Sequence, residues 1–113
     1  MCDRVKNMCG IIGCFRVNGI AEPAARSVLE GLRRLEYRGY DSAGVAALDG
    51  GTIVVRKDVG YVDQVAVRFG LEEMTGAVAV GHTRWATHGG VTQANAHPHT
   101  DIAGRIAVVH NGI

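Results

Sequence analysis

The chemistry of this chain centres on Cys9, which lies between Met8 and the apolar run Gly10-Ile11-Ile12-Gly13. If translation begins at Met8 and that methionine is removed, Cys9 carries a thiol and a free α-amine on one residue. The thiol has a reference pKa of about 8.5 and the amine one of about 7.7–8.0, so the amine can relay the thiol proton near neutral pH. This pairing predicts a nucleophile with its own base. The alternative is a small buried hydrophobe that opens a strand.

Two further polar groups lie where apolar runs end. Arg84 offers a planar fork of donors that suits a carboxylate, and Trp85 and Thr87 add a wall and a hydroxyl beside it. Asn111 and Gly112 offer a side-chain amide and an unobstructed backbone N–H, which is the donor pair that an acyl-transfer oxyanion requires. The structural alternatives are a solvated ion pair for the arginine and a plain turn for the Asn-Gly pair. Together with the cysteine, the set comprises a nucleophile, an anion clamp and an oxyanion hole.

The histidines raise the question of a metal site. Five of them lie within twenty-nine residues: His82, His88, His97, His99 and His110. His97-Pro98-His99 places two imidazoles close together, and Cys9 or Cys14 could add a thiolate ligand. The spacings match no common zinc pattern, and histidines at strand ends are more often structural. We therefore expect no metal, and a small histidine-rich metal-binding module is the alternative.

The composition limits the other classes of function. The chain has 113 residues, 47% hydrophobic and 20% charged, which suffices for one small domain. A formal net charge of +1 gives no electrostatic case for nucleic acid or a membrane surface. No apolar run approaches the ~20 residues of a membrane span, and no signal-like region opens the chain. We expect a cytoplasmic protein. Its three cysteines, all within the first fourteen residues, predict no disulfide framework.

The first half of the chain predicts a strand, a helix and a hairpin. Residues 9–15 form an apolar run typical of a buried strand. Pro23 opens a helix whose apolar residues recur at helical spacing up to a stop near Gly39. Two β-prone runs, residues 42–48 and 52–56, flank Asp49-Gly50-Gly51, which is a strong hairpin signal.

The second half predicts a helix and two strands. After a loop at residues 57–61, residues 62–73 have the spacing of a short helix that Gly70 interrupts. Residues 77–81 form a small-residue strand, and a further strand lies within residues 102–110. This order indicates an α/β or α+β domain with mainly antiparallel sheet. We expect residues 1–8 to be an extension or a misassigned start. Because the chain ends at the exit of an apolar strand, we expect a fragment.

The ordered set of motifs resembles the class II glutamine amidotransferase domain. The resemblance runs from Met8 to the end of the chain and is carried by residues 9–13, 29–44, 82–89, 95–99 and 108–113. Within that family, residues 37–42 read Tyr-Arg-Gly-Tyr-Asp-Ser, where the purine-pathway amidophosphoribosyltransferases typically carry His-Arg-Gly-Gln-Glu-Ser. This difference favours the branch that aminates fructose 6-phosphate, and an amidophosphoribosyltransferase-like protein is the alternative.

The resemblance implies an α+β fold, the N-terminal-nucleophile hydrolase four-layer αββα sandwich. Residues 9–113 would form the N-terminal half of the domain. By the same resemblance, Cys9 attacks the side-chain amide of L-glutamine, forms a γ-glutamyl thioester and releases ammonia. Asn111 and Gly112 form the oxyanion hole. Arg84 holds the substrate α-carboxylate, and three residues line the pocket: Trp85, Thr87 and His88.

The resemblance also implies partners outside this chain. In the family, ammonia passes to fructose 6-phosphate in separate sugar-phosphate isomerase-like domains and yields glucosamine 6-phosphate for hexosamine biosynthesis. Those domains are absent from these 113 residues, and the acidic residue that holds the substrate α-amino group is expected downstream of Ile113. The resemblance implies no cofactor and a homodimeric full-length protein. The alternative from another class is a non-catalytic truncated fragment.

Overall fold

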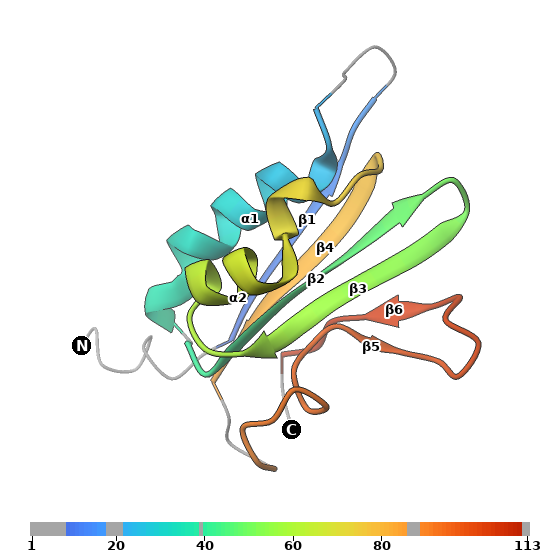
Figure 1. The fold of residues 1–113 in the computed structure, drawn as a ribbon. Helices are drawn as coiled ribbons and strands as arrows, with labels where there is room; N and C mark the ends of the chain where they lie inside the picture. Colours follow the sequence, from blue (N-terminus) through green and yellow to red (C-terminus); the bar gives the residue numbers. More distant parts are fainter. Residues whose placement is uncertain (1–8, 18–21, 39, 86–88, 112–113) are drawn as a thin grey trace.

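The computed structural model describes residues 9–17, 22–38, 40–85 and 89–111. In these ranges, two helices cover one face of a four-stranded sheet, and a small two-stranded hairpin lies on the other face (Figure 1). None of the helices in the described ranges is long and apolar enough to cross a membrane. The expected mainly antiparallel α+β architecture is confirmed.

The four-stranded sheet has the order β1-β4-β2-β3, and all its neighbouring strands are antiparallel. Its strands are β1 (Gly10–Phe15), β2 (Ser42–Asp49), β3 (Thr52–Val59) and β4 (Val78–Arg84). Gly50 and Gly51 both have positive φ angles, 58° and 82°, as the predicted hairpin turn between β2 and β3 requires. The predicted end of β3 at residue 56 was wrong, because the ladder with β2 continues to the pair Ser42 and Val59.

Both predicted helices are confirmed. The first is α1 (Ala24–Leu35), which is followed by the 3-10 turn η2 (Glu36–Arg38). The second is α2 (Val62–Phe69), followed by the 3-10 turn η3 (Leu71–Glu73). Gly70 separates α2 from η3 with a φ of 63°, the left-handed conformation that ends a helix at little cost for glycine.

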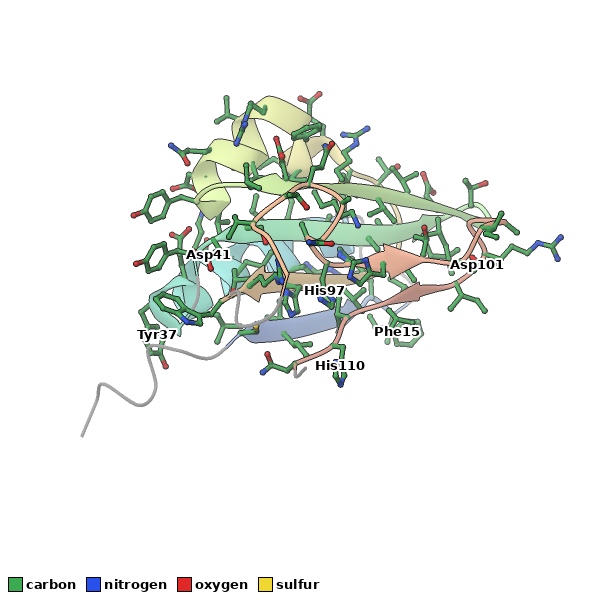
Figure 2. The ribbon with its side chains drawn as sticks, turned by 90° about the horizontal axis from the view of Figure 1, so that it is seen from below. Phe15, Tyr37, Asp41, His97, Asp101 and His110 are labelled. Carbon is green, nitrogen blue, oxygen red and sulfur yellow. The ribbon has the colours of Figure 1, made fainter. Side chains whose placement is uncertain are left out.

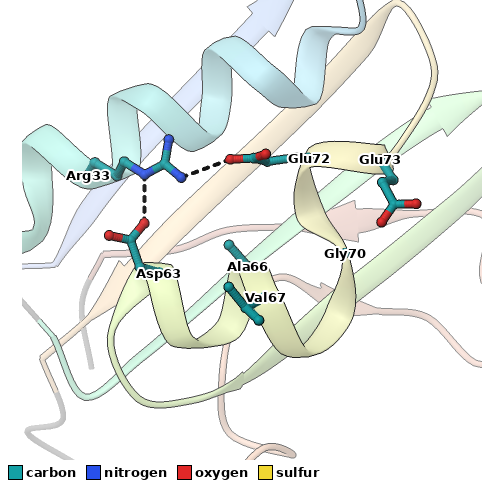
Figure 3. Close-up of a pocket in the computed structure, with 7 residues that line it drawn as sticks. All are labelled: Arg33, Asp63, Ala66, Val67, Gly70, Glu72 and Glu73. Atoms are coloured by element: carbon teal, nitrogen blue, oxygen red, sulfur yellow. Dashed lines mark hydrogen bonds and ion pairs between the residues drawn. The ribbon is translucent and has the colours of Figure 1, made fainter.

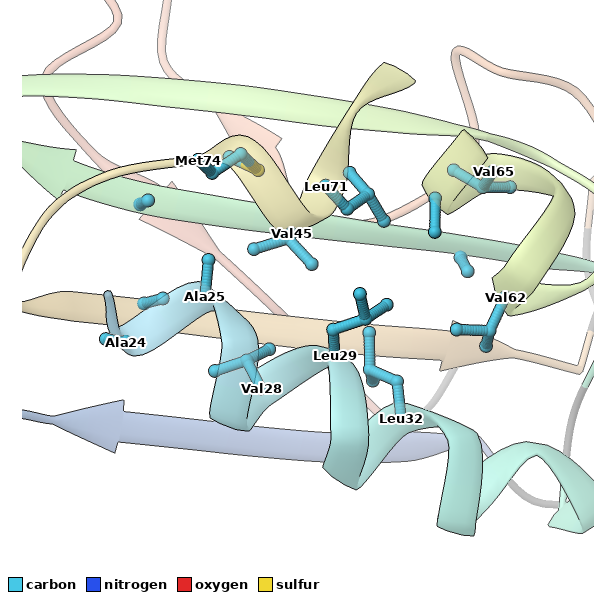
Figure 4. Packing of buried hydrophobic residues seen from close by; sticks show 14 residues of the cluster. Ala24, Ala25, Val28, Leu29, Leu32, Val45, Val62, Val65, Leu71 and Met74 are labelled. Atoms are coloured by element: carbon cyan, nitrogen blue, oxygen red, sulfur yellow. The ribbon is translucent and has the colours of Figure 1, made fainter. Parts of the chain in front are cut away.

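The hydrophobic core lies between the helices and the sheet (Figure 4). Leu29 and Leu32 of α1, Val45 of β2 and Val65 of α2 are at most 1% exposed. Helix α1 packs very closely on β4, since a Cβ on Gly81 would lie 2.4 Å from the Cγ1 of Val28. Each of these large side chains contributes about 1.5–3 kcal/mol of burial.

The opposite face of the sheet is covered by residues 89–111. A Cβ on Gly44 of β2 would lie 2.1 Å from the carbonyl oxygen of His97, so this segment rests directly on the sheet. It contains the strands β5 (His99–Thr100) and β6 (Ala107–Val108). The sequence predicted a single strand within residues 102–110 and no partner for it. The pair is short because Asp101 Oδ1 accepts the N–H groups of Arg105 and Ile106, at 2.7 and 2.9 Å, and so turns the chain.

Candidate active site

Cys9 lies at one end of the sheet, immediately before β1. Because Gly10 pairs with Thr83, the thiol lies beside the residues at the end of β4. The backbone N–H of Trp85 donates to Cys9 Sγ at 3.2 Å, and the same sulfur is 3.7 Å from the carbonyl oxygen of Trp85. The residue is half-buried. A partly accessible thiol held by a backbone donor has the position that a nucleophile needs.

Cys14 lies within β1, and its position fits the structural alternative considered for Cys9, that of a small buried hydrophobe. It packs against the hydrophobic core between the sheet and the helices. Side chains alternate between the two faces of a strand, so Cys9 and Cys14, five positions apart, belong to opposite faces. The structural alternative of a cysteine packed on the core therefore describes Cys14, whereas Cys9 faces the polar side.

Asn111 comes close to Cys9 from the far end of the chain. Its Nδ2 donates to the backbone carbonyl oxygen of Cys9 at 3.0 Å, although the two residues are 102 positions apart. The structure thus brings the predicted nucleophile and one predicted oxyanion donor together. The other predicted donor, Gly112, lies outside the described residues.

Arg84 is the last residue of β4 and is only 9% exposed. Its Nη1 donates to the carbonyl oxygen of Gly90 at 2.9 Å, and Asn95 Nδ2 donates to the same oxygen at 3.0 Å. The alternative of a solvated surface ion pair is therefore wrong, because the guanidinium is buried under the loop that follows β4. The predicted pocket residues Thr87 and His88 lie outside the described residues.

The sequence assigns no individual role to three residues that lie at this end of the sheet. Ser42 pairs with Arg84 in the β2–β4 ladder, and its buried hydroxyl has no hydrogen-bond partner within the described part of the chain. Tyr40 meets Trp85 edge to face at 5.3 Å between ring centroids and stacks on Tyr61 at 5.5 Å. Ser42 and Tyr40 belong to the polar cluster at residues 38–42, which precedes a predicted strand and so marks a possible site, whereas nothing in the sequence indicates Tyr61.

Three histidines form a stack on the polar face of the sheet. The ring of His82 lies 4.2 Å from that of His97, which lies 4.3 Å from that of His99. His82 is fully buried, and burial lowers its pKa to about 4. Burial and the neighbouring His82 also lower the pKa of His97 to about 4. Figure 2 views the molecule from the side of this face and labels His97 and His110.

This stack does not converge on a metal. The rings of His82 and His97 are within 24° of parallel, so their nitrogens lie in separate planes and do not point to a common centre. Within the described ranges, no group of three or more His, Cys, Asp or Glu side chains is arranged to hold a metal ion.

A pocket on the other side of the molecule is structural in character. It lies between α1 and α2 (Figure 3) and is lined by charged residues of both elements and of η3. Arg33 Nε bonds Asp63 Oδ1 at 2.7 Å, and its Nη2 bonds Glu72 Oε1 at 3.0 Å. Both acids raise the pKa of Arg33. This network ties the helices together.

Comparisons with known proteins find relatives of this chain. No protein-family model matches it. It is 56% identical to the glutamine–fructose-6-phosphate aminotransferase (isomerizing) of Pyrobaculum aerophilum over 106 residues, which is 94% of this chain and 17% of the relative. It is 50% identical over 109 residues to the enzyme of the same name from Mycobacterium bovis, with the same two shares. The chain thus spans about a sixth of the length of these relatives.

Solved structures agree with this assignment. The glutamine phosphoribosylpyrophosphate amidotransferase of B. subtilis, complexed with ADP and GMP, superposes with a TM-score of 0.65 at 30% identity. A structure described as the allosteric regulatory enzyme of purine biosynthesis gives 0.66 at 32% identity. Each match covers 78% of this chain and 18% of the other. The chain is therefore a homologue of part of the glutamine–fructose-6-phosphate aminotransferases, and its fold is similar to that of a solved glutamine amidotransferase.

Proposed function

We propose that residues 9–113 form the nucleophile-bearing half of a glutamine-hydrolysing domain. The observation that carries this proposal is the meeting of Cys9, Trp85 and Asn111 at one end of the sheet. These residues are far apart in the sequence, and together they supply a thiol and an amide donor within one small volume. Residues 1–8 would be an extension that is removed or never translated, because the mechanism needs a free α-amine on Cys9.

The chemistry begins with attack of Cys9 Sγ on the side-chain amide carbon of glutamine. The α-amine of Cys9 takes the thiol proton and returns it to the leaving nitrogen, so the collapse of the tetrahedral intermediate releases ammonia and leaves a γ-glutamyl thioester. Water then hydrolyses the thioester to glutamate. The Asn111 amide has two N–H donors, so it can hold the Cys9 carbonyl with one and the developing oxyanion with the other. Gly112 would add its backbone N–H.

Arg84 would hold the α-carboxylate of glutamine. Its guanidinium has five N–H donors, so it can bond Gly90 and bind a carboxylate together. Trp85, Thr87 and His88 would line the rest of the pocket. No metal or cofactor takes part in this scheme.

The proposal extends to a longer reaction. The relatives named above are glutamine–fructose-6-phosphate aminotransferases, so we propose that ammonia made here passes to fructose 6-phosphate in domains outside these 113 residues and yields glucosamine 6-phosphate. We propose that the full-length protein is a cytoplasmic homodimer. The alternative acceptor is phosphoribosylpyrophosphate, but identities of 50–56% against 30% favour the sugar phosphate.

Two cysteine variants test the glutaminase proposal. In the longest translated form of the protein, with its N-terminus at Cys9, Cys9→Ala should abolish release of glutamate from glutamine, a loss of at least about 1,000-fold. Cys14→Ala is the matched control, since it removes the other thiol of the described residues and should leave turnover nearly unchanged. Turnover that survives Cys9→Ala would contradict the proposal, and an inactive wild type would favour a non-catalytic fragment.

A further inference from the structure

We propose that His82 and His97 are positioning residues for the oxyanion donor Asn111 and that they act through the backbone of His110. This inference rests on the proposed glutaminase function. The N–H of His110 donates to His97 Nδ1 at 3.3 Å, and the carbonyl oxygen of His110 lies 3.0 Å from His82 Nε2. Both polar backbone atoms of the residue before Asn111 are thus held by imidazoles.

The two bonds fix the proton positions of both rings. A carbonyl oxygen can only accept, so His82 carries its proton on Nε2. A backbone N–H can only donate, so His97 Nδ1 is unprotonated. Within the described residues, the buried Nδ1 of His82 has no partner, so the bond to His110 is the polar contact of that ring. The lowered pKa values of both rings agree with two neutral imidazoles.

The pair His82 and His97, called the clamp below, is itself anchored to the sheet. His82 lies within β4 and stacks on His97. Lys57 of β3 donates to the carbonyl oxygens on either side of His97, those of Ala96 at 2.7 Å and Pro98 at 3.0 Å. The missing side chain of Gly44 lets the His97 carbonyl rest against β2. Three strands therefore fix the two imidazoles.

The backbone near Asn111 needs this support because the strand pairing has already ended. The last strand of the described chain, β6, stops at Val108, three residues before Asn111. Beyond it, the hydrogen bonds of a sheet no longer hold the main chain. The two imidazoles therefore hold the main chain at His110 in a fixed position relative to the sheet. In this way they position the Asn111 amide that contacts Cys9.

This role predicts a specific kinetic signature. Loss of one oxyanion donor costs about 100–1,000-fold in kcat, and its displacement should cost less. We expect His82→Leu and His97→Leu each to lower kcat about 10–100-fold and to leave the KM for glutamine within about twofold, because the predicted carboxylate contact at Arg84 is unchanged.

Conservative variants separate positioning from bulk packing. The Oδ1 of Asn in His97→Asn can accept where Nδ1 did, and the Nε2 of Gln in His82→Gln can donate where the ring did. Both should recover kcat to within about threefold of wild type. His99→Leu is the matched control, since it removes a ring of the same stack that makes no bond to His110 in the described structure, and it should keep wild-type kcat.

The deciding experiment combines these variants with two further measurements in the longest translated form of the protein. Alkylation of Cys9 by iodoacetamide forms no oxyanion, so its rate should be unchanged in all variants that lose kcat. In an Asn111→Ala background, His97→Leu should cause no additional loss of kcat, because both changes remove the same contribution.

The outcomes distinguish this inference from the function on which it rests. Leucine variants with wild-type kcat, or full additivity of His97→Leu with Asn111→Ala, would overturn the clamp and leave the glutaminase proposal standing. A parallel fall in alkylation and turnover would also overturn it, since that result indicates that the variant disturbs the Cys9 thiol itself and not only the oxyanion donor. A wild-type protein that alkylates at Cys9 but never hydrolyses glutamine would overturn the proposed function, and the clamp with it.

Discussion

The two faces of the four-stranded sheet do different work. On the helical face, Val45 of β2 and Ala79 of β4 pack against α1 and α2 with at most 2% exposure. On the opposite face, the same two strands present Ser42, His82 and Arg84, all buried and polar. Alternate residues of one strand thus serve the core and the candidate site in turn. Stability and chemistry can therefore be altered separately, and each variant below acts mainly on one face.

Hydrophobic residues show the same division. Leu29 on the helical face is 1% exposed, whereas Phe15 and Val108 on the other side are 74% and 51% exposed. Apolar side chains contribute to folding in proportion to the area that they remove from water. The helical face therefore supplies most of the hydrophobic stabilisation in the described residues.

The largest effect on stability should come from the helical face. Leu29→Ala removes a fully buried side chain from the core between α1 and the sheet, so it should lower the free energy of unfolding by about 2–5 kcal/mol. Urea unfolding measures this change. The kcat per folded molecule should stay the same, because Leu29 does not touch the polar face. A large fall in kcat at constant folded fraction would break the proposed separation.

The next effect should come from the polar face and should spare stability. Arg84→Lys keeps the charge but loses the two-pronged fork, so the KM for glutamine should rise about 10–100-fold and more than kcat falls. Steady-state kinetics in the longest translated form of the protein, with Arg16→Lys as a control elsewhere on the chain, gives both constants. An unchanged KM would remove Arg84 from the pocket.

Acid should destabilise the protein through the polar face. His82 has a pKa of about 4 when folded and 6.5 as its ordinary value, so the unfolded state binds more protons between these limits. The stabilisation is complete above about pH 6.5 and is lost as the pH falls towards 4. We expect the free energy of unfolding to drop about 1.5 kcal/mol between pH 6.5 and pH 5 on account of His82.

Variants of two histidines check this assignment. His82→Gln should reduce the dependence of unfolding free energy on pH in that window and leave the part that His97 contributes. His110→Gln changes an exposed side chain and should keep the wild-type slope. Equal slopes in wild type and His82→Gln would show that burial of His82 is not the cause.

The smallest effect should come from the charged network between the helices. Arg33→Ala breaks the ion pairs with Asp63 and Glu72, which are solvent-accessible, so it should cost at most about 1 kcal/mol. The cost should shrink in 1 M salt, as measured by thermal unfolding. Arg34→Ala, whose side chain is 80% exposed, should cost less still. A loss above about 2 kcal/mol would show that this network rivals the apolar core.

Much of the fold could be predicted from the sequence, because the helices and the hairpin depend on local sequence patterns. Periodicity indicated α1 and α2, and the Asp49-Gly50-Gly51 turn indicated the β2–β3 hairpin. The last three residues of β3 and the short strand β5 could not be predicted, because they depend on a ladder with another strand and on a side-chain turn at Asp101.

The site divides in the same way. The residue types of Cys9, Arg84 and Asn111 indicated their chemistry. For His82 and His97, the sequence raised only the possibility of a metal site. Their contacts with the backbone of His110 depend on how two distant segments of the chain meet on the sheet. The residue types alone do not indicate this meeting. The roles given to Thr87, His88 and Gly112 stay predictions.

The most direct test of the central claim is a mass spectrum of the active protein, quenched in acid during turnover of glutamine. The account predicts an N-terminal peptide that begins at Cys9, with a fraction of it carrying one glutamyl group on the thiol. The same experiment with Cys9→Ala should show no adduct. Sustained turnover by a protein that still carries Asn7 and Met8 before Cys9 would contradict the account.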